Sequence, residues 1–498
     1  MTKTGVLIVG GGVTGLTTAL LLQQYGTPFL LVERHAGTSP QPKARRFNQR
    51  SMEVFRRLGV TDAIGAASKA LANFQGMLTG ATLAMATWPE LTPNLTERIA
   101  QHAAFAELSP EPSVLCPQDV LEPVLRDAID PAFLRFGTEV VDLHDQTAVL
   151  ADGSTVEFEY VVAADGARSP IRERLGVARS GIGHLAANLD IYFRADLAEL
   201  VRGREFNLCS IENPAASGAF VSINGTDRWL FSTTDGERDL DHWVSTLRTV
   251  IGIDVPVEII SILPWESGMY VADTYRGGRV FLAGDSAHVM PPMAAAGANT
   301  GIADADNLAW KLAFVLSGVA GEGLLDTYHA ERYPVGYATA EFSSGSAGHL
   351  GDMIKSITSE KVAFDMGAAV FGAQYGEGGA FVPDGRSESP VDQYAPGGRP
   401  GTRIPHVWVK PGMSSLDLVS GLTLLATAEA WEMAASAAGV RCVAVDPEFA
   451  KLAGLLSGGA VLVRPDGIVG WHCAEMPPEP SALLADAVRR VTFAQPRA

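Results

Sequence analysis

The chain has few cysteines, and none of them stands in a pattern that carries metal or disulfide chemistry. Its 498 residues include 4 cysteines, at positions 116, 209, 442 and 473. No two are close neighbours, which excludes a CxxC redox pair and the ligand spacing of a zinc site, so we expect no bound metal. Isolated thiols in a chain of this length favour a reducing compartment, and we expect the cytoplasm.

Positive charge is also scarce. The chain has 38 Lys and Arg against 56 Asp and Glu, a formal net charge of −18. Nucleic acids and anionic membrane surfaces attract proteins through cationic patches, so we expect neither as a partner. We also expect no secretory leader, because the N-terminus runs directly into VLIVGGG. Residues 70–89 carry no charge, but they are too rich in Gly, Thr, Asn and Gln to cross a membrane.

What the N-terminus does contain is an apolar run, a glycine-rich turn and an apolar-faced helix. Residues 6–9 predict a buried parallel strand, and residues 16–25 predict a helix. The turn between them has the form GxGxxG. Gly10 permits the tight turn, Gly12 lets the backbone approach a pyrophosphate, and Gly15 lets helix and strand pack closely, so that the helix N-terminus faces the phosphates.

An acidic residue follows at the distance that a dinucleotide site requires. A second apolar run, at 29–32, ends at Glu33, where a carboxylate can accept hydrogen bonds from ribose hydroxyls. Such an acid suits FAD or NAD and would repel the 2′-phosphate of NADP. The pattern predicts one dinucleotide site, with a glycine-rich turn that binds nothing as the alternative. We find no second strand–GxGxxG–helix unit, so a reducing nicotinamide would lack its own Rossmann domain.

A second segment, far along the chain, suits contact with a flavin. Residues 279–283 predict another buried strand, ended by Gly284-Asp285. Asp285 is placed to accept a hydrogen bond from a ribityl hydroxyl, with a turn cap as the alternative. Pro291-Pro292 stiffens the following loop. A helix then begins at 297–299, and its N-terminus could stabilise negative charge on a reduced flavin ring.

These motifs resemble those of the class A flavoprotein aromatic hydroxylases, the p-hydroxybenzoate hydroxylase-like FAD monooxygenases. The resemblance extends over essentially the whole chain. It is carried by GGGVTG at 10–15, PKARRFNQRSMEVFRRLGV at 42–60, CPQDVLEPVL at 116–125, DGARSPIR at 165–172, the stretch 284–312, Tyr328, Glu331, Arg332 and Pro334, and LVRPDGIVGWH at 462–472. The chain most resembles the polyketide and natural-product hydroxylase branch, which carries a C-terminal thioredoxin-like domain.

The resemblance implies an α/β fold with three domains. We expect a Rossmann-like FAD-binding domain over 1–175 and 270–390. An antiparallel β-sheet substrate domain is expected over 176–269, with contributions from about 65–110. A thioredoxin-like α/β domain is expected over 400–498, and without a CxxC it should be redox-inert. The inserted part itself has the alternation and turn residues of antiparallel strands, at 188–195, 205–212, 218–224 and 228–232.

The resemblance also assigns site residues. Arg45 and Arg46 are the predicted catalytic residues; one should lie over the flavin ring or reach the substrate, and the sequence leaves open which. Lys43 replaces an arginine usual in the family, keeping the charge but losing the planar fork. The predicted cofactor-binding residues are Gly10, Gly12, Val13, Thr14, Gly15, Glu33, Arg34, Lys43, Arg45, Gln118, Asp165, Asp285, Pro292, Gly297, Ala298 and Asn299. The predicted substrate-lining residues are Phe206, Phe220, Trp229, Phe231 and Pro291, with plain core packing as the alternative for the aromatic ones.

The implied reaction is hydroxylation of a polycyclic, polyketide-type phenol through a flavin C4a-hydroperoxide. FAD is the expected cofactor, NADPH or NADH the reductant and O2 the co-substrate. The expected partner is this small aromatic substrate, bound by a monomer or a homodimer. Three alternatives stay open: a Baeyer–Villiger-type oxygenation, hydroxylation of a smaller phenol or an antibiotic, and a non-catalytic FAD protein that binds an aromatic ligand. His288 is interpreted as a structural loop residue.

Overall fold

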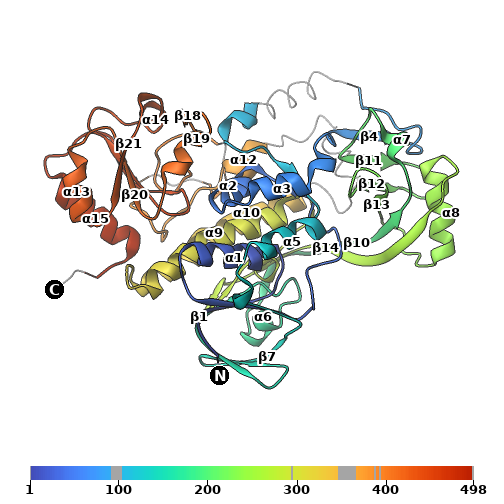
Figure 1. Cartoon of the computed structure of the whole chain (residues 1–498), viewed down its shortest axis with the longest axis horizontal. Coiled ribbons are helices and arrows are strands. Elements are labelled where there is room, and N and C mark those ends of the chain that lie inside the picture. Colours follow the sequence, from blue (N-terminus) through green and yellow to red (C-terminus); the bar gives the residue numbers. More distant parts are fainter. Residues whose placement is uncertain are drawn as a thin grey trace.

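The computed structural model describes residues 2–90, 104–292, 295–345, 366–385, 389–391 and 394–495. Three larger β-sheets are distributed along the molecule (Figure 1). The C-terminal sheet and the antiparallel sheet lie at opposite ends, and the N-terminal sheet lies between them below the long helices α9 (Ala296–Leu316) and α10 (Thr327–Ser344). The predicted α/β fold class is confirmed.

The first sheet has parallel strands around β1, in the order β15-β16-β9-β1-β2-β6. Val6, Leu7 and Ile8 of β1 are fully buried because both faces of the sheet are covered. Val6 and Ile8 pack on the helix side, and Leu7 packs with the strands on the other side. The strands are β1 (Thr2–Val9), β2 (Phe29–Glu33), β6 (Leu134–Phe136), β9 (Thr155–Ala163), β15 (Arg276–Gly277) and β16 (Val280–Leu282), extended by β7 (Val140–His144) and β8 (Thr147–Leu150).

Helices from distant parts of the chain cover this sheet. Helix α1 begins at Val13, three residues before the predicted start at 16, because Gly12 is its N-cap and Gly15 lies in its first turn. This helix packs against α9 and against the helix that follows Pro117. Within the described residues, no helix combines the length and apolar character that a membrane span needs. The additional helices are α1 (Val13–Gln24), α2 (Gln49–Arg57), α3 (Thr61–Ala67), α5 (Gln118–Asp127) and α6 (Pro170–Arg174).

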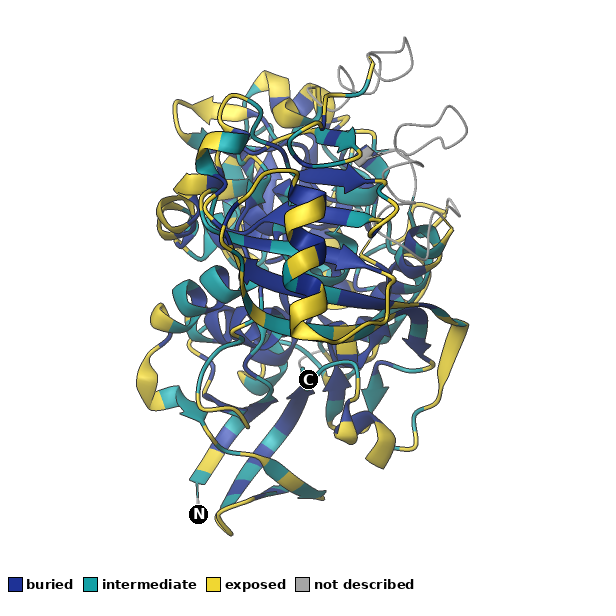
Figure 2. Cartoon of the chain, turned by 90° about the vertical axis from the view of Figure 1, so that its right-hand side faces the viewer, coloured by how far each residue is buried: buried dark blue, intermediate teal, exposed yellow. Residues whose placement is uncertain are grey.

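The second sheet is mainly antiparallel and has the order β17-β14-β10-β13-β12-β11-β4. Strand β10 begins at Arg179, nine residues before the predicted start at 188, because it pairs along its length with β14. Helix α8 (Leu240–Ile251) covers the outer face, and Figure 2 looks onto this helix with buried strands behind it. The strands are β4 (Met77–Gly80), β10 (Arg179–Arg194), β11 (Leu208–Ile211), β12 (Gly218–Ser222), β13 (Arg228–Thr233), β14 (Glu258–Ala272) and β17 (His288–Val289).

Strand β4 is contributed by the segment before the inserted part, and it pairs in parallel with β11. Residues 91–103 of the predicted contribution from 65–110 lie outside the described residues. Strands β3 (Arg46–Phe47) and β5 (Val114–Leu115) pair in a separate short two-stranded sheet.

The C-terminal sheet has the order β21-β20-β22-β23 and an apolar core on each face. Along β20, Leu424 and Ala426 face α13 and α15, whereas Leu425 faces the side of α14, as the period of two in a strand requires. A short helix, α12 (Met366–Phe371), precedes this sheet along the chain. The elements are β20 (Thr423–Ala426), α13 (Trp431–Ala437), β21 (Arg441–Ala444), α14 (Pro447–Leu452), β22 (Ala460–Val463), β23 (Val469–Cys473) and α15 (Pro480–Thr492).

Candidate cofactor site

The turn between β1 and α1 has room for glycine alone. Gly10 has φ +113°, and a Cβ built on it would lie 2.2 Å from the carbonyl oxygen of Ala164. A Cβ on Gly15 would lie 2.0 Å from the carbonyl oxygen of Gly10. Helix α1 therefore begins directly against the end of β1. This is a cradle of the kind that binds pyrophosphate at a helix N-terminus.

Glu33 lies beside this turn at the end of β2. Its Oε2 accepts a hydrogen bond from Gly11 N–H at 2.7 Å, and its Oε1 accepts one from His35 N–H at 2.8 Å. Arg34 is exposed to solvent next to it. The structure thus brings Glu33 to the glycine turn, as the dinucleotide pattern predicts, and leaves Arg34 at the surface.

Three segments meet at Thr14 in the first turn of α1. A Cβ on Gly284 would lie 2.5 Å from Thr14 Oγ1, and a Cβ on Gly301 would lie 2.4 Å from the same atom. Gly284 also has φ +63°, and its N–H donates to Asp304 Oδ2 at 3.0 Å. The predicted residue Val13 is buried beside this contact. The two glycine-containing motifs of the sequence, more than 250 residues apart, are therefore in direct contact.

Polar groups suited to a flavin dinucleotide lie around this contact. Part of the surface of Asp285 is open to solvent, although protein atoms lie around its carboxyl. Desolvation raises the pKa of this carboxyl, and the charges of His288 and Lys43 oppose the rise. Burial also raises the pKa of the Glu122 carboxyl, and the charge of Lys43 opposes this rise. Asp165 Oδ1 is buried with no hydrogen-bond partner among the described residues, and desolvation raises the pKa of this carboxyl. The glycine turn, the cation Lys43 and the carboxylates of Asp165 and Asp285, which have acceptor atoms available, fit FAD.

The segment with Lys43 is held in place by α5. Gln118 N–H donates to the Ala44 carbonyl at 2.7 Å, and Gln118 Oε1 accepts from Ala44 N–H at 3.2 Å. Gln118 Nε2 donates to Glu122 Oε1 at 2.6 Å. The Gln118 side chain therefore positions the 43–46 segment. The sequence predicted only a contact of Gln118 with the cofactor, and not this positioning role.

Arg45 and Arg46 point to different parts of the protein. Arg45 is buried and donates to the Ser222 carbonyl at 2.9 Å and to the Asn207 carbonyl at 2.5 Å, so it ties this segment to the second sheet. Desolvation, with a contribution from Arg46, lowers the pKa of Arg45 to about 9. Arg46 is partly buried and donates to Ser113 Oγ at 3.2 Å. Their predicted catalytic roles stay predictions.

Asn299 joins the first turn of α9 to the segment that contains these arginines. Its Nδ2 donates to the carbonyls of Ala295 at 2.7 Å and Arg46 at 3.1 Å. Its Oδ1 accepts from Asn48 N–H at 3.0 Å and from Ser51 Oγ–H at 2.6 Å. Ala295 itself has φ +54°, a left-handed conformation that is strained for alanine. Of the other predicted residues here, Pro291 is buried, Pro292 is exposed, and Gly297 and Ala298 are partly buried.

Loss of the hydrogen bonds of Asn299 should lower the stability of the protein. In Asn299→Ala, the donors and acceptors that Asn299 satisfies would be left buried without partners. We expect the free energy of unfolding to fall by about 1–3 kcal/mol and FAD to bind more weakly. Chemical denaturation and flavin titration measure both effects. Asn213→Ala is the control, because the contacts of Asn213 lie at the surface; an equal loss in both variants would contradict the role of Asn299.

A buried triad stabilises the Gly284 turn. His288 Nε2 lies 2.6 Å from Asp304 Oδ2, and Arg332 Nε donates to Asp304 Oδ1 at 2.8 Å. Burial raises the pKa of Asp304, but the charges of His288 and Arg332 outweigh it, and the net pKa is lowered. This agrees with the interpretation of His288 as a structural residue. The role of Asp304 was not predicted, and the only sequence signal is its place in the DAD stretch of α9.

The four aromatic residues predicted to line the substrate cavity lie instead in the core under α8. Phe206, Phe220, Trp229 and Phe231 are fully buried together, and the rings of Phe231 and Trp243 of α8 lie 6.2 Å apart. The opposite face of the same sheet meets the first domain: there, Arg228 donates to Asp119 at 2.9 Å and to Tyr192 at 3.0 Å. Because side chains alternate along a strand, residues 229 and 231 point away from the cofactor segments.

Comparisons with known proteins extend this description. The family profile "FAD binding domain" matches residues 3–343, and the profile "Aromatic-ring hydroxylase, C-terminal" matches residues 397–496. A "Putative polyketide hydroxylase" of Streptomyces halstedii is 38% identical, over 98% of this chain and 96% of that protein. A 4-methyl-5-nitrocatechol 5-monooxygenase of Burkholderia is 36% identical, over 98% of this chain and 97% of that protein. The crystal structure of aklavinone-11 hydroxylase in complex with FAD and aklavinone is similar, with a TM-score of 0.86 and 32% identity, and the match covers 99% of each chain.

Proposed function

Because the chain belongs to the family of FAD-dependent aromatic-ring hydroxylases, we propose that it hydroxylates a polycyclic, polyketide-type phenol, using O2 and NADPH or NADH. The observation that carries the proposal is the contact of the two glycine motifs at Thr14, and this contact supports one shared cradle for a flavin dinucleotide. The relatives named polyketide hydroxylase and aklavinone-11 hydroxylase support the substrate class.

The residues of this chain divide the work of holding FAD. The glycine turn and the N-terminus of α1 would receive the pyrophosphate, with Lys43 as a counter-charge, and Glu33 would accept from the ribose. Asp285 would accept from a ribityl hydroxyl, and the first turn of α9 would stabilise negative charge on the ring. When bound and reduced, FAD supplies the activation of O2 and the transfer of one oxygen atom. The protein supplies orientation and a site that excludes water.

The predicted domains divide the remaining tasks. Residues 1–175 and 270–390 bind the cofactor, residues 176–269 with the strand at 77–80 form the substrate wall, and residues 400–498 pack without redox chemistry. The substrate faces the side of the second sheet that bears Tyr192 and Arg228, because the other side is closed by α8. We further propose a cytoplasmic protein that acts as a monomer or homodimer and binds no nucleic acid.

A smaller phenol is the second candidate substrate. The relative named 4-methyl-5-nitrocatechol 5-monooxygenase covers nearly the whole chain at 36% identity, so the fold also accommodates a single-ring substrate. A Baeyer–Villiger-type oxygenation and a non-catalytic aromatic-binding role are outcomes that the following experiment separates.

The test is NADPH and NADH oxidation by the FAD-loaded protein, with and without a panel of single-ring and polycyclic phenols, together with product mass. We expect a polycyclic phenol to accelerate oxidation and to gain one oxygen atom as a hydroxyl. A lactone product would instead indicate Baeyer–Villiger oxygenation, and turnover of single-ring phenols alone would favour the second candidate. FAD binding without stimulated oxidation by any compound of a broad panel would overturn the proposal.

A further inference from the structure

The face of the second sheet that is turned away from α8 carries a carboxylate, Asp190 of β10. Leu189 and Ile191 of this strand belong to the core under α8, so Asp190 between them points to the opposite face. On that opposite face, Ser261 Oγ of β14 accepts a hydrogen bond from Gln41 Nε2 at 3.3 Å. Asp190 therefore lies on the face that meets the first domain.

The Asp190 carboxyl has neutral donors beside it and no cation. Its Oδ1 accepts from Ser232 Oγ–H at 2.6 Å. The indole N–H of Trp265 also lowers the pKa of Asp190, although it forms no regular hydrogen bond with the described residues. Desolvation outweighs both donors and raises that pKa, and no cation among the described residues acts on it. Acceptor capacity therefore remains on this carboxyl, since a carboxylate has about four lone-pair sites.

Apolar side chains flank the carboxyl on the same face. Leu263 of β14 is the cross-strand partner of Asp190. Leu230 of β13 lies two residues from Ser232, the partner of Asp190 on the other side. Both leucines are partly exposed, and neither belongs to the core under α8 or to the core around β1. The face thus combines an apolar surface with a carboxylate, which matches a ring that bears a hydroxyl group.

A neutral phenolic hydroxyl is the group that this carboxylate binds best. Ser232 and Trp265 supply neutral donors, and a desolvated carboxylate with spare acceptor sites is stabilised by a further donor. A phenol O–H forms a charge-assisted hydrogen bond with a carboxylate, whereas a ketone or ether oxygen offers no hydrogen. A carboxylate on the ligand would be repelled by the like charge.

We propose that Asp190 is a specificity-determining residue for the hydroxylation: its carboxylate accepts a hydrogen bond from a neutral phenolic hydroxyl of the substrate, whose rings lie against Leu230 and Leu263. This inference rests on the proposed function and deepens it, because it selects phenols over their ethers and over carboxylated rings. It also assigns the hydroxyl-bearing edge of the substrate to the second sheet.

The test measures binding of 2-naphthol and of its ether, 2-methoxynaphthalene, to the FAD-loaded protein by calorimetry, without NADPH. The wild type should bind the phenol at least about tenfold more tightly, because only the phenol donates a hydrogen bond. In Asp190→Asn, the amide oxygen keeps the Ser232 hydrogen bond and the NH2 group donates to either ligand oxygen, so the ratio of the two Kd values should fall to about one. Glu266→Gln is the matched control. Because Glu266 is exposed on the other face of β14, the ratio should keep its wild-type value.

Two further measurements do not depend on the Asp190 variant. Leu230→Ala removes apolar contact with the rings, so both compounds should bind roughly threefold or more weakly while the ratio stays unchanged. A crystal structure with 6-bromo-2-naphthol locates the ligand through the anomalous signal of bromine. The hydroxyl should lie within hydrogen-bond distance of Asp190.

An equal ratio in the wild type and Asp190→Asn, a hydroxyl placed away from Asp190, or no binding of 2-naphthol at about 1 mM would each overturn the proposal. If Asp190→Asn does not fold, Leu230→Ala and the crystal structure still decide. Product analysis is separate. Asp190-dependent binding without any hydroxylated product would overturn the proposed reaction alone, and hydroxylation with an unchanged ratio would overturn the role of Asp190 alone.

Discussion

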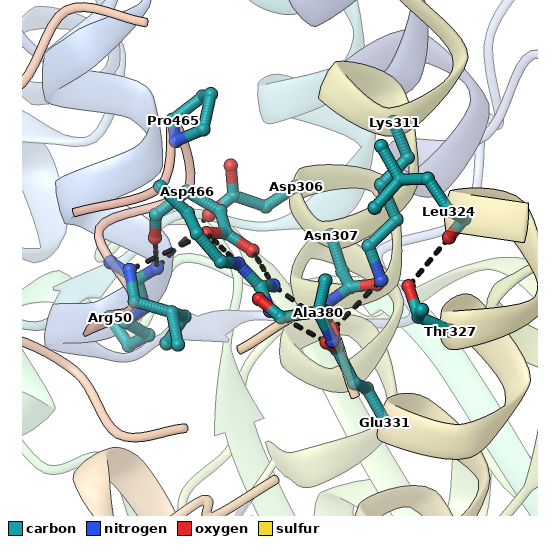
Figure 3. Close-up of polar contacts among 12 residues, drawn as sticks. Arg50, Asp306, Asn307, Lys311, Leu324, Thr327, Glu331, Ala380, Pro465 and Asp466 are labelled. Atoms are coloured by element: carbon teal, nitrogen blue, oxygen red, sulfur yellow. Dashed lines mark hydrogen bonds and ion pairs between the residues drawn. The ribbon is translucent and has the colours of Figure 1, made fainter. Parts of the chain in front are cut away.

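Replacing Arg464 with methionine should lower the free energy of unfolding by about 3–5 kcal/mol, because Asp466 and Glu331 stay buried and only Lys311 is left to pair with Glu331. Arg464 is fully buried and bonds through Nη1 and Nη2 to Glu331 of α10 at 2.6 and 3.0 Å. Its Nε donates to Asp466 at 3.0 Å. Figure 3 shows how Asp466 and Glu331 converge with Lys311 and Asn307 at this point. The substitution would break the link between the C-terminal sheet and α10.

The measurement is equilibrium denaturation, with Arg490→Met as the control. Arg490 pairs with Asp486 at the surface of α15 and is more than half exposed, so its loss should cost less than about 1 kcal/mol. A loss below about 1 kcal/mol in Arg464→Met as well would contradict the role of the buried network. A second readout is limited proteolysis between residues 367 and 400, which should accelerate only in Arg464→Met.

The same network predicts how stability depends on pH. Burial raises the pKa of Glu331, but Arg464 and Lys311 outweigh it and hold that pKa far below the ordinary value of 4.5. A carboxylate with a lowered pKa contributes stability that is complete above its unfolded pKa and is lost as pH falls towards the folded value. The difference in stability between the wild type and Arg464→Met should therefore shrink as the pH falls below 4.5.

Gly15→Ala should abolish most FAD binding, although alanine normally favours a helix. Its Cβ would lie 2.0 Å from the Gly10 carbonyl oxygen, so α1 must move away from the end of β1. That movement displaces the N-terminus of α1 from the pyrophosphate and breaks the contact at Thr14. We expect FAD to bind at least roughly tenfold more weakly, and overpacking to cost about 1–3 kcal/mol of stability. Flavin content after purification and titration of the apoprotein with FAD measure the effect.

Gly65→Ala is the matched control. Gly65 is an exposed residue of α3, and a Cβ there would have no neighbour within 4 Å. The same change should therefore stabilise the protein by about 0.5–1 kcal/mol and leave FAD affinity unchanged. Equal FAD affinity in Gly15→Ala and Gly65→Ala would contradict the assignment of the cradle.

Local patterns were sufficient to predict the glycine turn. The spacing of Gly10, Gly12 and Gly15 between an apolar strand and a helix restricts the backbone of adjacent residues, and Glu33 ends the next strand as predicted. The aromatic residues of the second sheet show where such reasoning fails. Trp229 and Phe231 were correctly placed on a strand, but the face they occupy depends on which side α8 covers.

The sequence by itself therefore determined the α/β class, the family and the glycine turn beside Glu33, because these depend on neighbouring residues and on backbone sterics. Only the tertiary structure decided which distant groups meet: Thr14 with Gly284 and Gly301, and Arg464 with Glu331. The physical reason is that burial, pairing and desolvation of a side chain are set by elements packed around it, and hundreds of residues separate those elements along the chain.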